Sequence, residues 1–429
     1  MSCATALCAL WLAGPGTSLP GAPAALAPVP DATHDAVAST QAADAPLTLA
    51  SALDEARAAS PTTRAAQLRA QGAQASARWA GGFPNPSLDV HTENWQPGGR
   101  AATDPLNDTF VVLSQPIELS GKAAARRRLA EAEASGRAMD ARLVERQLVL
   151  DVATAFLAAA RASGRQALLA TQAESTREIV TILERRVAEG VAPEADLRKV
   201  EADLARLDTE ATRVEIDLQA SLARLGALLG RDTPVLRSQI VAPDPAEWAM
   251  APSPLTLTRV PEVASARQRA ATASAAFDLA KRERWPDLVV SGGYKRTSGV
   301  DTAVAGASVT IPVFDNGQRA VALGSAELAA AQQEAIGAER LARAEAAARF
   351  AEARLLSDRA AHVEHDVLRP AEIAWRAART SFREGAGDVL RLLDAERVYG
   401  DARREASDLK LEATLAQVRA RLASGEERP

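Results

Sequence analysis

The chain has 429 residues, with 50 lysines and arginines against 55 aspartates and glutamates, and a formal net charge of −5 at pH 7. This balance, without any block of basic residues, argues against a nucleic-acid partner. Aromatic residues make up only 3% of the chain, and the two cysteines, Cys3 and Cys8, both lie near the N-terminus. The composition therefore excludes a disulfide framework and a thiolate metal site, and it favours thin layers of long helices over a thick globular core.

The N-terminus begins with a short apolar segment, residues 3–13, which is followed by small residues, prolines and glycines. This pattern predicts a secretory signal peptide over residues 1–24 and a flexible linker over residues 25–46. No Lys or Arg precedes the apolar segment, so a disordered leader rich in Ala and Pro is the alternative. Cys8 does not follow a small residue, and we expect no lipid there. No long apolar run follows, and we expect no transmembrane helix.

The chain contains two copies of one sequence pattern, about 195 residues apart. Residues 185–205 resemble residues 380–400, so that Glu201 in the first copy corresponds to Glu396 in the second. Two further anchors keep nearly the same offset, namely Pro86-Ser87-Leu88 with Pro286-Asp287-Leu288, and LSQPIELSGK (113–122) with VTIPVFDNGQ (309–318). The expected organisation is a first repeat, a Pro-rich connector and a second repeat, covering residues 47–230, 231–255 and 256–424.

Each repeat is predicted to contain a helix, two strands, a long helix, a turn and a return helix. The segment from Lys122 to Glu189 contains no proline, so nothing interrupts a helix there, which would span about 100 Å. The matching segment, from Gly317 to Glu384, contains one proline, Pro370, which should kink that helix or start a new one at Leu368-Arg369. Gly190 and Gly385 are predicted to end the two long helices. After the turns, Pro193 should lie in the first turn of the first return helix, and Asp388 should cap the second.

The first return helix carries a series of apolar residues spaced three and four apart. The series is Leu197, Val200, Leu204, Leu207, Ala211, Val214, Leu218, Leu222, Leu225 and Leu229. The spacing predicts a narrow apolar stripe with polar flanks, which suits helices that pack edge to edge in one layer. An ordinary soluble antiparallel coiled coil has the same periodicity, so periodicity alone leaves both possibilities open.

Four segments are rich in β-forming residues, and the clearest of them alternate apolar and polar residues: 87–94, 110–119, 287–294 and 303–314. Each has about the length of a tilted membrane-spanning strand, and aromatic residues gather around them as at membrane interfaces. A small soluble sheet covered by helices is the alternative. If the strands enter a bilayer, four cannot close on themselves, because open edges leave backbone groups unpaired in hydrocarbon. Two copies would supply eight strands and three copies twelve, and an aqueous pore favours three copies.

From about Leu47 to Leu422, the chain resembles the TolC-type outer-membrane efflux proteins. The most specific stretch is 367–396, which is similar to the family's pattern of Pro, spaced small and apolar residues, an aromatic residue, Gly and then Leu-Leu-Asp-Ala. The segments PNPSLDV (84–90) and QPIELSGKAAARR (115–127) look like the CzcC-like heavy-metal branch of this family.

The resemblance implies a mainly helical α+β fold, in which a homotrimer forms a twelve-stranded barrel in outer-membrane lipid, four strands from each chain, and a helical tunnel in the periplasm. It implies a passive, gated exit duct that works with a periplasmic adaptor (a membrane fusion protein) and an inner-membrane efflux pump of the resistance-nodulation-division type. The branch motifs imply heavy-metal cations such as cobalt, zinc and cadmium as substrates. A multidrug duct of the same family, or a periplasmic coiled-coil adaptor or scaffold, is the alternative.

The two turns would lie at the periplasmic end of the tunnel, where the resemblance implies contact with the adaptor. Glycines in such turns allow another hairpin to approach closely, although plain turns have the same composition. The predicted adaptor-binding residues are Glu189, Gly190, Val191, Ala192 and Pro193 in the first turn, and Glu384, Gly385, Ala386 and Gly387 in the second.

Acidic residues of the second return helix line the narrow end of the tunnel in this family. Asp394 matches one such position, whereas Arg391 stands where a second acid is expected. Three copies of Asp394 near one axis would concentrate negative potential and favour cations. Together with Asp388, these residues are our candidates for gating or cation selectivity.

Other chemistry has little support in the sequence. His362 and His365 lie three residues apart and precede Asp366, but a solvated helix face explains them better than a metal site. The sequence holds no phosphate-binding loop, dinucleotide fingerprint, nucleophile elbow or zinc-protease helix. We therefore expect no enzyme activity, no cofactor and no metal site.

Overall fold

The computed structural model describes residues 46–94, 108–248, 255–297 and 299–426, which belong to one unit of the chain. The predicted signal peptide, both cysteines and all of the predicted linker except Pro46 lie outside these ranges, as does part of the predicted connector. Within the described ranges, no helix combines the length and the apolar character needed to cross a membrane.

Helices make up most of the described chain and follow the predicted order, although two helices rather than one precede the strands in the first repeat. The first repeat contains α1 (Leu49–Ala59), α2 (Pro61–Ala77), α3 (Lys122–Ala188) and α4 (Glu194–Leu228). The second contains α6 (Pro261–Glu283), α7 (Gln318–His362), a π-helical segment (Val363–Leu368), α8 (Arg369–Arg383) and α9 (Val389–Ser424). Between them lie α5 (Pro245–Trp248) and two short 3-10 turns, Arg237–Gln239 and Leu257–Arg259.

The two long helical segments differ as predicted from the presence of a proline in the second and its absence from the first. α3 runs unbroken for 67 residues. Its counterpart α7 changes to a π-helix at Val363 and restarts as α8, with Pro370 in the first turn. Proline has no N–H to donate to the carbonyl four residues earlier, so the regular hydrogen-bond pattern cannot pass through it. The predicted break at Leu368-Arg369 is confirmed, and it leaves the second repeat with an irregular backbone where the first has none.

The strands form one antiparallel sheet in the order β1 (Ser87–Glu93), β2 (Asp108–Ile117), β3 (Leu288–Thr297) and β4 (Val300–Val309). β2 and β3 come from different repeats and pair along their whole length, so the sheet joins the two repeats. The fourth strand was predicted to reach Phe314 but ends at Val309, the last residue that has a partner on β3. β3 begins at Leu288, so the residues after Val309 have no partner on that strand, and Pro312 has no N–H to continue a ladder.

The sheet has one apolar and one polar face, as the alternation predicted. Residues directly opposite each other share a face, so Val90 lies beside Val111 on the apolar side. On the polar side, the Phe110 ring lies between the His91 ring, at 4.7 Å, and the Lys295 ammonium group, at 4.9 Å from the ring centroid.

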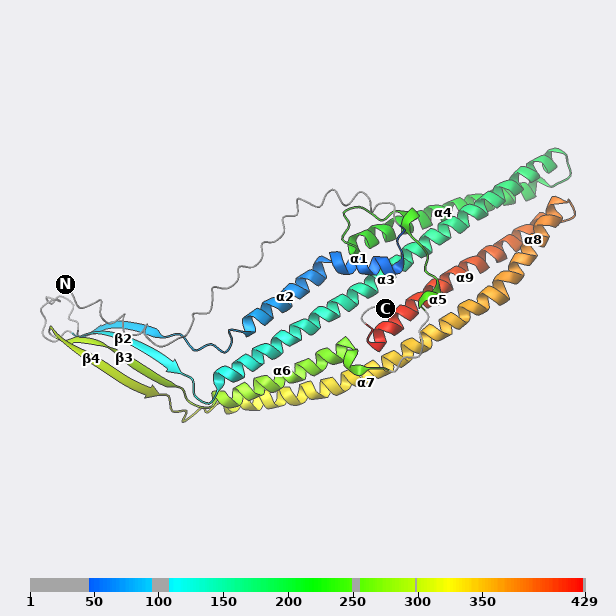
Figure 1. The fold of residues 1–429 in the computed structure, drawn as a ribbon. Helices are drawn as coiled ribbons and strands as arrows, with labels where there is room; N and C mark the ends of the chain where they lie inside the picture. The colour runs from blue at the N-terminus through cyan, green and yellow to red at the C-terminus, as the bar shows by residue number, and fades with distance from the viewer. Residues whose placement is uncertain (1–45, 95–107, 249–254, 298, 427–429) are drawn as a thin grey trace. The chain divides into compact units, whose positions relative to one another are not determined.

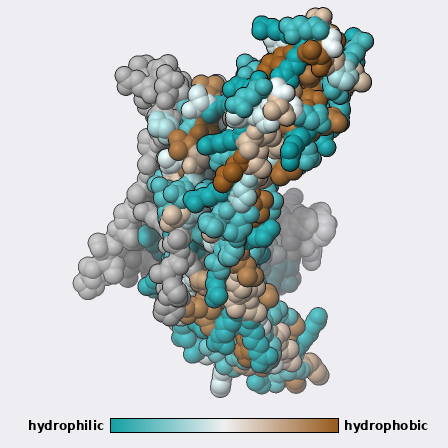
Figure 2. Space-filling view, turned by 90° about the vertical axis from the view of Figure 1, so that its right-hand side faces the viewer, coloured by the Kyte–Doolittle hydropathy of each residue, from teal (hydrophilic) through white to brown (hydrophobic). Residues whose placement is uncertain are grey.

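The helices lie side by side in a single layer, as the narrow apolar stripe of α4 predicted (Figure 1). α3 contacts α2 and α6 on the side of the sheet and α4 and α9 further along, and α7 contacts α6 and α9. An apolar cluster surrounds the middle of α3, from Leu148 to Ala162, and includes residues of α1, α4 and α9 and the ring of Trp248. On the face shown in Figure 2, apolar and hydrophilic patches alternate along the helices, as expected where broad faces stay in contact with water.

Candidate functional site

The first hairpin turn ends α3 with a glycine in the left-handed region. Gly190 has φ of +74°. The N–H of Gly190 donates to the carbonyl of Val187 at 3.0 Å, and the N–H of Val191 donates to that of Arg186 at 2.9 Å, the hydrogen-bond pattern of a Schellman motif. Pro193 was predicted in the first turn of α4, but it precedes the helix as its N-cap, with extended backbone. Its fixed φ suits this position as well, and its lack of an N–H costs nothing there.

The second turn has a tighter backbone. Gly385 has φ of +80°, and the N–H groups of Ala386 and Gly387 both donate to the carbonyl of Ser381, each at 3.0 Å. A Cβ atom on Gly387 would lie 2.8 Å from Ser381 Oγ, so only glycine fits without movement. Asp388 then caps α9, since its side chain accepts from the N–H of Leu390 at 3.3 Å, which confirms its predicted role as a cap.

An apolar cluster joins the two hairpins directly behind the turns. Its buried members are Ile179, Leu183, Leu197, Val200, Phe382, Val389 and Leu392, contributed by α3, α4, α8 and α9. Ala192 packs against this cluster from the first turn. The other residues of the first turn and Glu384, Gly385 and Ala386 of the second are exposed. Both tips therefore present backbone and small side chains to solvent while their bases are fixed to each other.

Charged contacts reinforce this junction. Glu178 on α3 pairs with Arg379 on α8, at 2.7 Å, and with Arg383 one turn further along. The hydrogen bond from Arg379 is the main cause that lowers the pKa of Glu178, so this carboxylate stays ionised at neutral pH.

Asp394 and Arg391 lie about one turn apart on α9, and both are exposed. Neither forms an ion pair with another of the described residues, so Arg391 does not neutralise Asp394 within the chain. Their predicted role in gating or selectivity stays a prediction.

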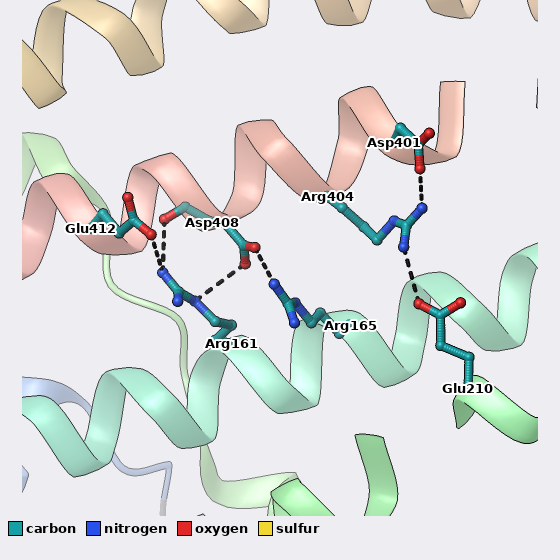
Figure 3. Close-up of polar contacts among 7 residues, drawn as sticks. All are labelled: Arg161, Arg165, Glu210, Asp401, Arg404, Asp408 and Glu412. Carbon is teal, nitrogen blue, oxygen red and sulfur yellow. Dashed lines mark hydrogen bonds and ion pairs between the residues drawn. The ribbon is translucent and has the colours of Figure 1, made fainter. Parts of the chain in front are cut away.

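A network of ion pairs between α9 and the first hairpin was missed in the sequence (Figure 3). Arg161 on α3 binds Asp408 at 3.3 Å and Glu412 at 2.8 Å, and Arg165 also binds Asp408. Arg404 on α9 binds Glu210 on α4 at 3.0 Å. The spacing of four residues between Arg161 and Arg165, and between Arg404, Asp408 and Glu412, was a signal that these charges share a helix face.

The two histidines contact different oxygen atoms on the same helical stretch. The Nδ1 atom of His365 lies 2.6 Å from the carboxylate of Asp366, whereas that of His362 lies 2.8 Å from the carbonyl of Asp358. Among the residues the structure describes, no group of three His, Cys, Asp or Glu side chains is arranged to hold a metal ion.

This architecture of a shared sheet and two long helical hairpins is that of outer-membrane export channels. The family model described as "Outer membrane efflux protein" matches residues 52–231 and 253–426, and the chain belongs to that family. The fold is TolC-like: the outer membrane protein VceC of Vibrio cholerae superposes with a TM-score of 0.72 at 21% identity, over 88% of this chain and 96% of that one. The transmembrane channel protein CusC superposes with a TM-score of 0.76 at 18% identity, over 88% of this chain and 92% of that one.

Two of the curated relatives are named for resistance to metals. The cobalt-zinc-cadmium resistance protein CzcC of Cupriavidus metallidurans is 28% identical over 83% of this chain and 85% of its own length. The nickel-cobalt-cadmium resistance protein NccC of Alcaligenes xylosoxydans xylosoxydans is 29% identical over 69% of this chain and 68% of its own. The predicted family, the fold class and the outer-membrane location are thereby confirmed, and these two relatives are similar to the chain in the way the predicted heavy-metal branch implies.

Proposed function

We propose that three copies of this chain form a passive duct that exports heavy-metal cations, delivered by an inner-membrane pump and a periplasmic adaptor. The observation that carries this proposal is the sheet, whose edge strands β1 and β4 each pair with only one strand among the described residues and which has an exposed apolar face. Its exposed members include Leu88, Val90, Leu113, Val290 and Val309. In hydrocarbon the unpaired edges would cost several kcal/mol for each backbone group, and pairing with further copies in a twelve-stranded barrel removes them.

Aromatic side chains support membrane insertion at the end of the sheet that joins the helices. Trp79 and Phe83 precede β1, Trp285 precedes β3 and Phe314 follows β4. These four side chains are 63% to 96% exposed, although each is large and apolar. Because adjacent strands are antiparallel, these positions share one end of the sheet, where they would form the aromatic belt of a membrane–water interface.

The helical layer also has two edges that suit contact between copies. α7 exposes Leu323, Leu341 and Leu355, whose spacing keeps them on one stripe, and each is more than 60% exposed. On the opposite edge, α2 exposes Leu68 and α4 exposes Ile216. A contact of one edge with the other is head-to-tail, and three such contacts would close a ring around a tunnel in the periplasm.

The substrate follows from the relatives and from the end of the tunnel. The names of two relatives specify resistance to cobalt and cadmium, with zinc in one and nickel in the other. The exposed Asp394, which has no ion pair among the residues that the structure describes, would present three carboxylates near the axis, which favours cations. The exposed tips Glu189–Pro193 and Glu384–Gly387 would contact the adaptor, and the pump, of the resistance-nodulation-division type, supplies the energy. The chain itself has no catalytic role.

Three experiments test the proposal. The mass of the purified protein in detergent, measured by light scattering, should correspond to three chains, and a monomer would overturn the duct. A strain that lacks the gene should lose growth on zinc, cobalt or cadmium and regain it with the wild-type gene. Sensitivity to organic drugs alone would replace the metal substrate with the multidrug alternative. The Asp394→Asn variant should assemble normally but show reduced cation selectivity in planar bilayers.

A further inference from the structure

Glu396 is a buried carboxylic acid at the junction of three helices. It belongs to α9, exposes 6% of its surface and lines a pocket of about 90 Å³ together with Ser175 of α3 and Trp375 of α8. Its counterpart in the first repeat, Glu201 on α4, is partly exposed and binds Arg198 on its own helix at 2.9 Å. The same position thus holds a solvated, paired acid in one hairpin and a buried acid in the other.

Among the described residues, no lysine or arginine forms an ion pair with Glu396. Arg379 on α8, the cation whose charge acts on Glu396, pairs with Glu178 on α3 at 2.7 Å and lies over the Trp375 ring. Burial is the main cause that raises the pKa of Glu396 above the ordinary range of a glutamate, whereas the polar groups of Ser175 and Trp375 and the charge of Arg379 lower it. An ionised carboxylate here would be buried with no ion pair of its own, since Arg379 already pairs with Glu178, and this is unfavourable.

The two other arginines that line the pocket also contact groups other than Glu396. Arg403 on α9 lies 5.5 Å from the ring centroid of Tyr399, which stacks on Trp375 at 4.9 Å. Arg404 on α9 binds Glu210 on α4 and Asp401 on its own helix. The stacked rings hold α8 against α9, so a change at Glu396 acts on the packing of this pair against α3.

We propose that Glu396 is a pH-sensitive contact between α3 and the α8–α9 hairpin, and that the loss of its proton favours their separation and so opens the periplasmic end of the duct. This inference rests on the proposed function. With the proton bound, the neutral carboxyl group fits between the helices beside Ser175. Without the proton, the charge gains hydration only when the helices part. The irregular backbone at Val363–Leu368 and Pro370 lets α8 move where α3 is continuous.

The sign of the effect follows from linkage. The packed state binds the proton more tightly than the separated state, in which Glu396 is hydrated. Acidification therefore favours the packed state, within the window between the ordinary pKa of a glutamate and the raised pKa of Glu396. The ratio of separated to packed molecules should rise about tenfold for each unit by which the two pKa values differ.

Conductance in planar bilayers from about pH 5 to about pH 8 tests the inference on the full-length protein. The wild-type open probability should rise with pH, whereas Glu396→Gln, which mimics the protonated acid, should stay low throughout. Glu201→Gln is the matched control and should keep the wild-type profile. An unchanged pH profile in Glu396→Gln would overturn the inference while leaving the duct intact.

Hydrogen exchange of α8 and α9 in detergent gives a second readout that needs no conductance. After correction for intrinsic exchange rates, protection in the wild type should fall with rising pH and stay constant in Glu396→Gln. If the protein forms no channel at any pH, the proposed function fails, and the exchange experiment still decides the inference. Equal pH dependence of protection in both proteins would refute it.

Discussion

The guanidinium group of Arg186, in α3, donates a hydrogen bond to the backbone carbonyl of Phe382, in α8, at 2.8 Å, and lies 4.7 Å from the centroid of the same residue's ring. One arginine thereby satisfies a carbonyl in the last turn of α8 and covers an aromatic side chain that is 2% exposed. A cation over an aromatic face is more strongly stabilising where water is excluded. The two hairpins are joined at their tips by this pair and by the apolar cluster around it.

Truncation of Phe382 should separate the tips. Phe382→Ala removes the largest side chain of the tip cluster and leaves a cavity, for which we expect a cost of about 3–5 kcal/mol in the packing of α8 on α3. Hydrogen exchange of α8 and denaturant unfolding in detergent measure this cost. Val191→Ala is the control, because Val191 is 69% exposed and its truncation should change stability by less than about 0.5 kcal/mol. Equal effects of the two variants would show that the cluster does not hold the hairpins together.

Alanine at Gly387 should strain the second turn. Its Cβ atom would lie 2.8 Å from Ser381 Oγ and 2.9 Å from the backbone nitrogen of Phe382, and the backbone cannot yield without loss of the two hydrogen bonds to Ser381. We expect a destabilisation of about 1–3 kcal/mol. Gly72→Ala, within α2, meets nothing within 4 Å and should instead stabilise by up to about 1 kcal/mol. Thermal unfolding of both variants in the same detergent checks the opposite signs.

Local rules on the sequence predicted most of the fold. The missing N–H of Pro370 and the left-handed glycines Gly190 and Gly385 act within one turn of helix, so the sequence sufficed to place these breaks. The end of β4 depended on its partner strand rather than on its own alternation, which continues to Phe314. The two members of the Glu201 and Glu396 pair look alike in sequence. Only the neighbours that α3 and α8 bring to Glu396 make it a buried acid.

Of the ion pairs in Figure 3, those that join two helices should stabilise the protein more than the pair within one helix. Asp408 accepts from both Arg161 and Arg165 and its side chain is 20% exposed, whereas Asp401, at 58%, pairs with Arg404 on its own helix. Asp408→Asn should cost about 1–2 kcal/mol and Asp401→Asn less than about 0.5 kcal/mol. Denaturant unfolding at low and high salt measures both. A larger loss for Asp401→Asn would contradict the assignment.

The stability of the helical region should fall in acid partly through Glu364. Its carboxylate, in the π-helical segment, accepts from Lys410 on α9 at 2.7 Å, and this hydrogen bond lowers its pKa. A lowered pKa adds stability that is present above the unfolded pKa and is lost as the pH falls through the folded pKa. Both groups are nearly half exposed, so Glu364→Gln should cost less than about 1 kcal/mol at neutral pH and should reduce the loss in acid. Melting temperatures against pH check this. The change in stability caused by Glu396→Gln should have the opposite sign, because the pKa of Glu396 is raised rather than lowered.

A lysine on the apolar face of β1 should destabilise the inserted protein more than a lysine on the polar face. Val90 is 63% exposed on the apolar face, and Val90→Lys should destabilise the inserted protein by about 2–4 kcal/mol if this residue faces the centre of the bilayer. The adjacent residue, His91, lies on the opposite face against Phe110, and His91→Lys places the same charge there at a much smaller cost. Denaturant unfolding from lipid vesicles and heat-dependent gel mobility of the assembled protein measure the difference. Both variants place a lysine on β1, one on each face, so equal losses would mean that both faces have the same surroundings, contrary to a strand that separates lipid from water.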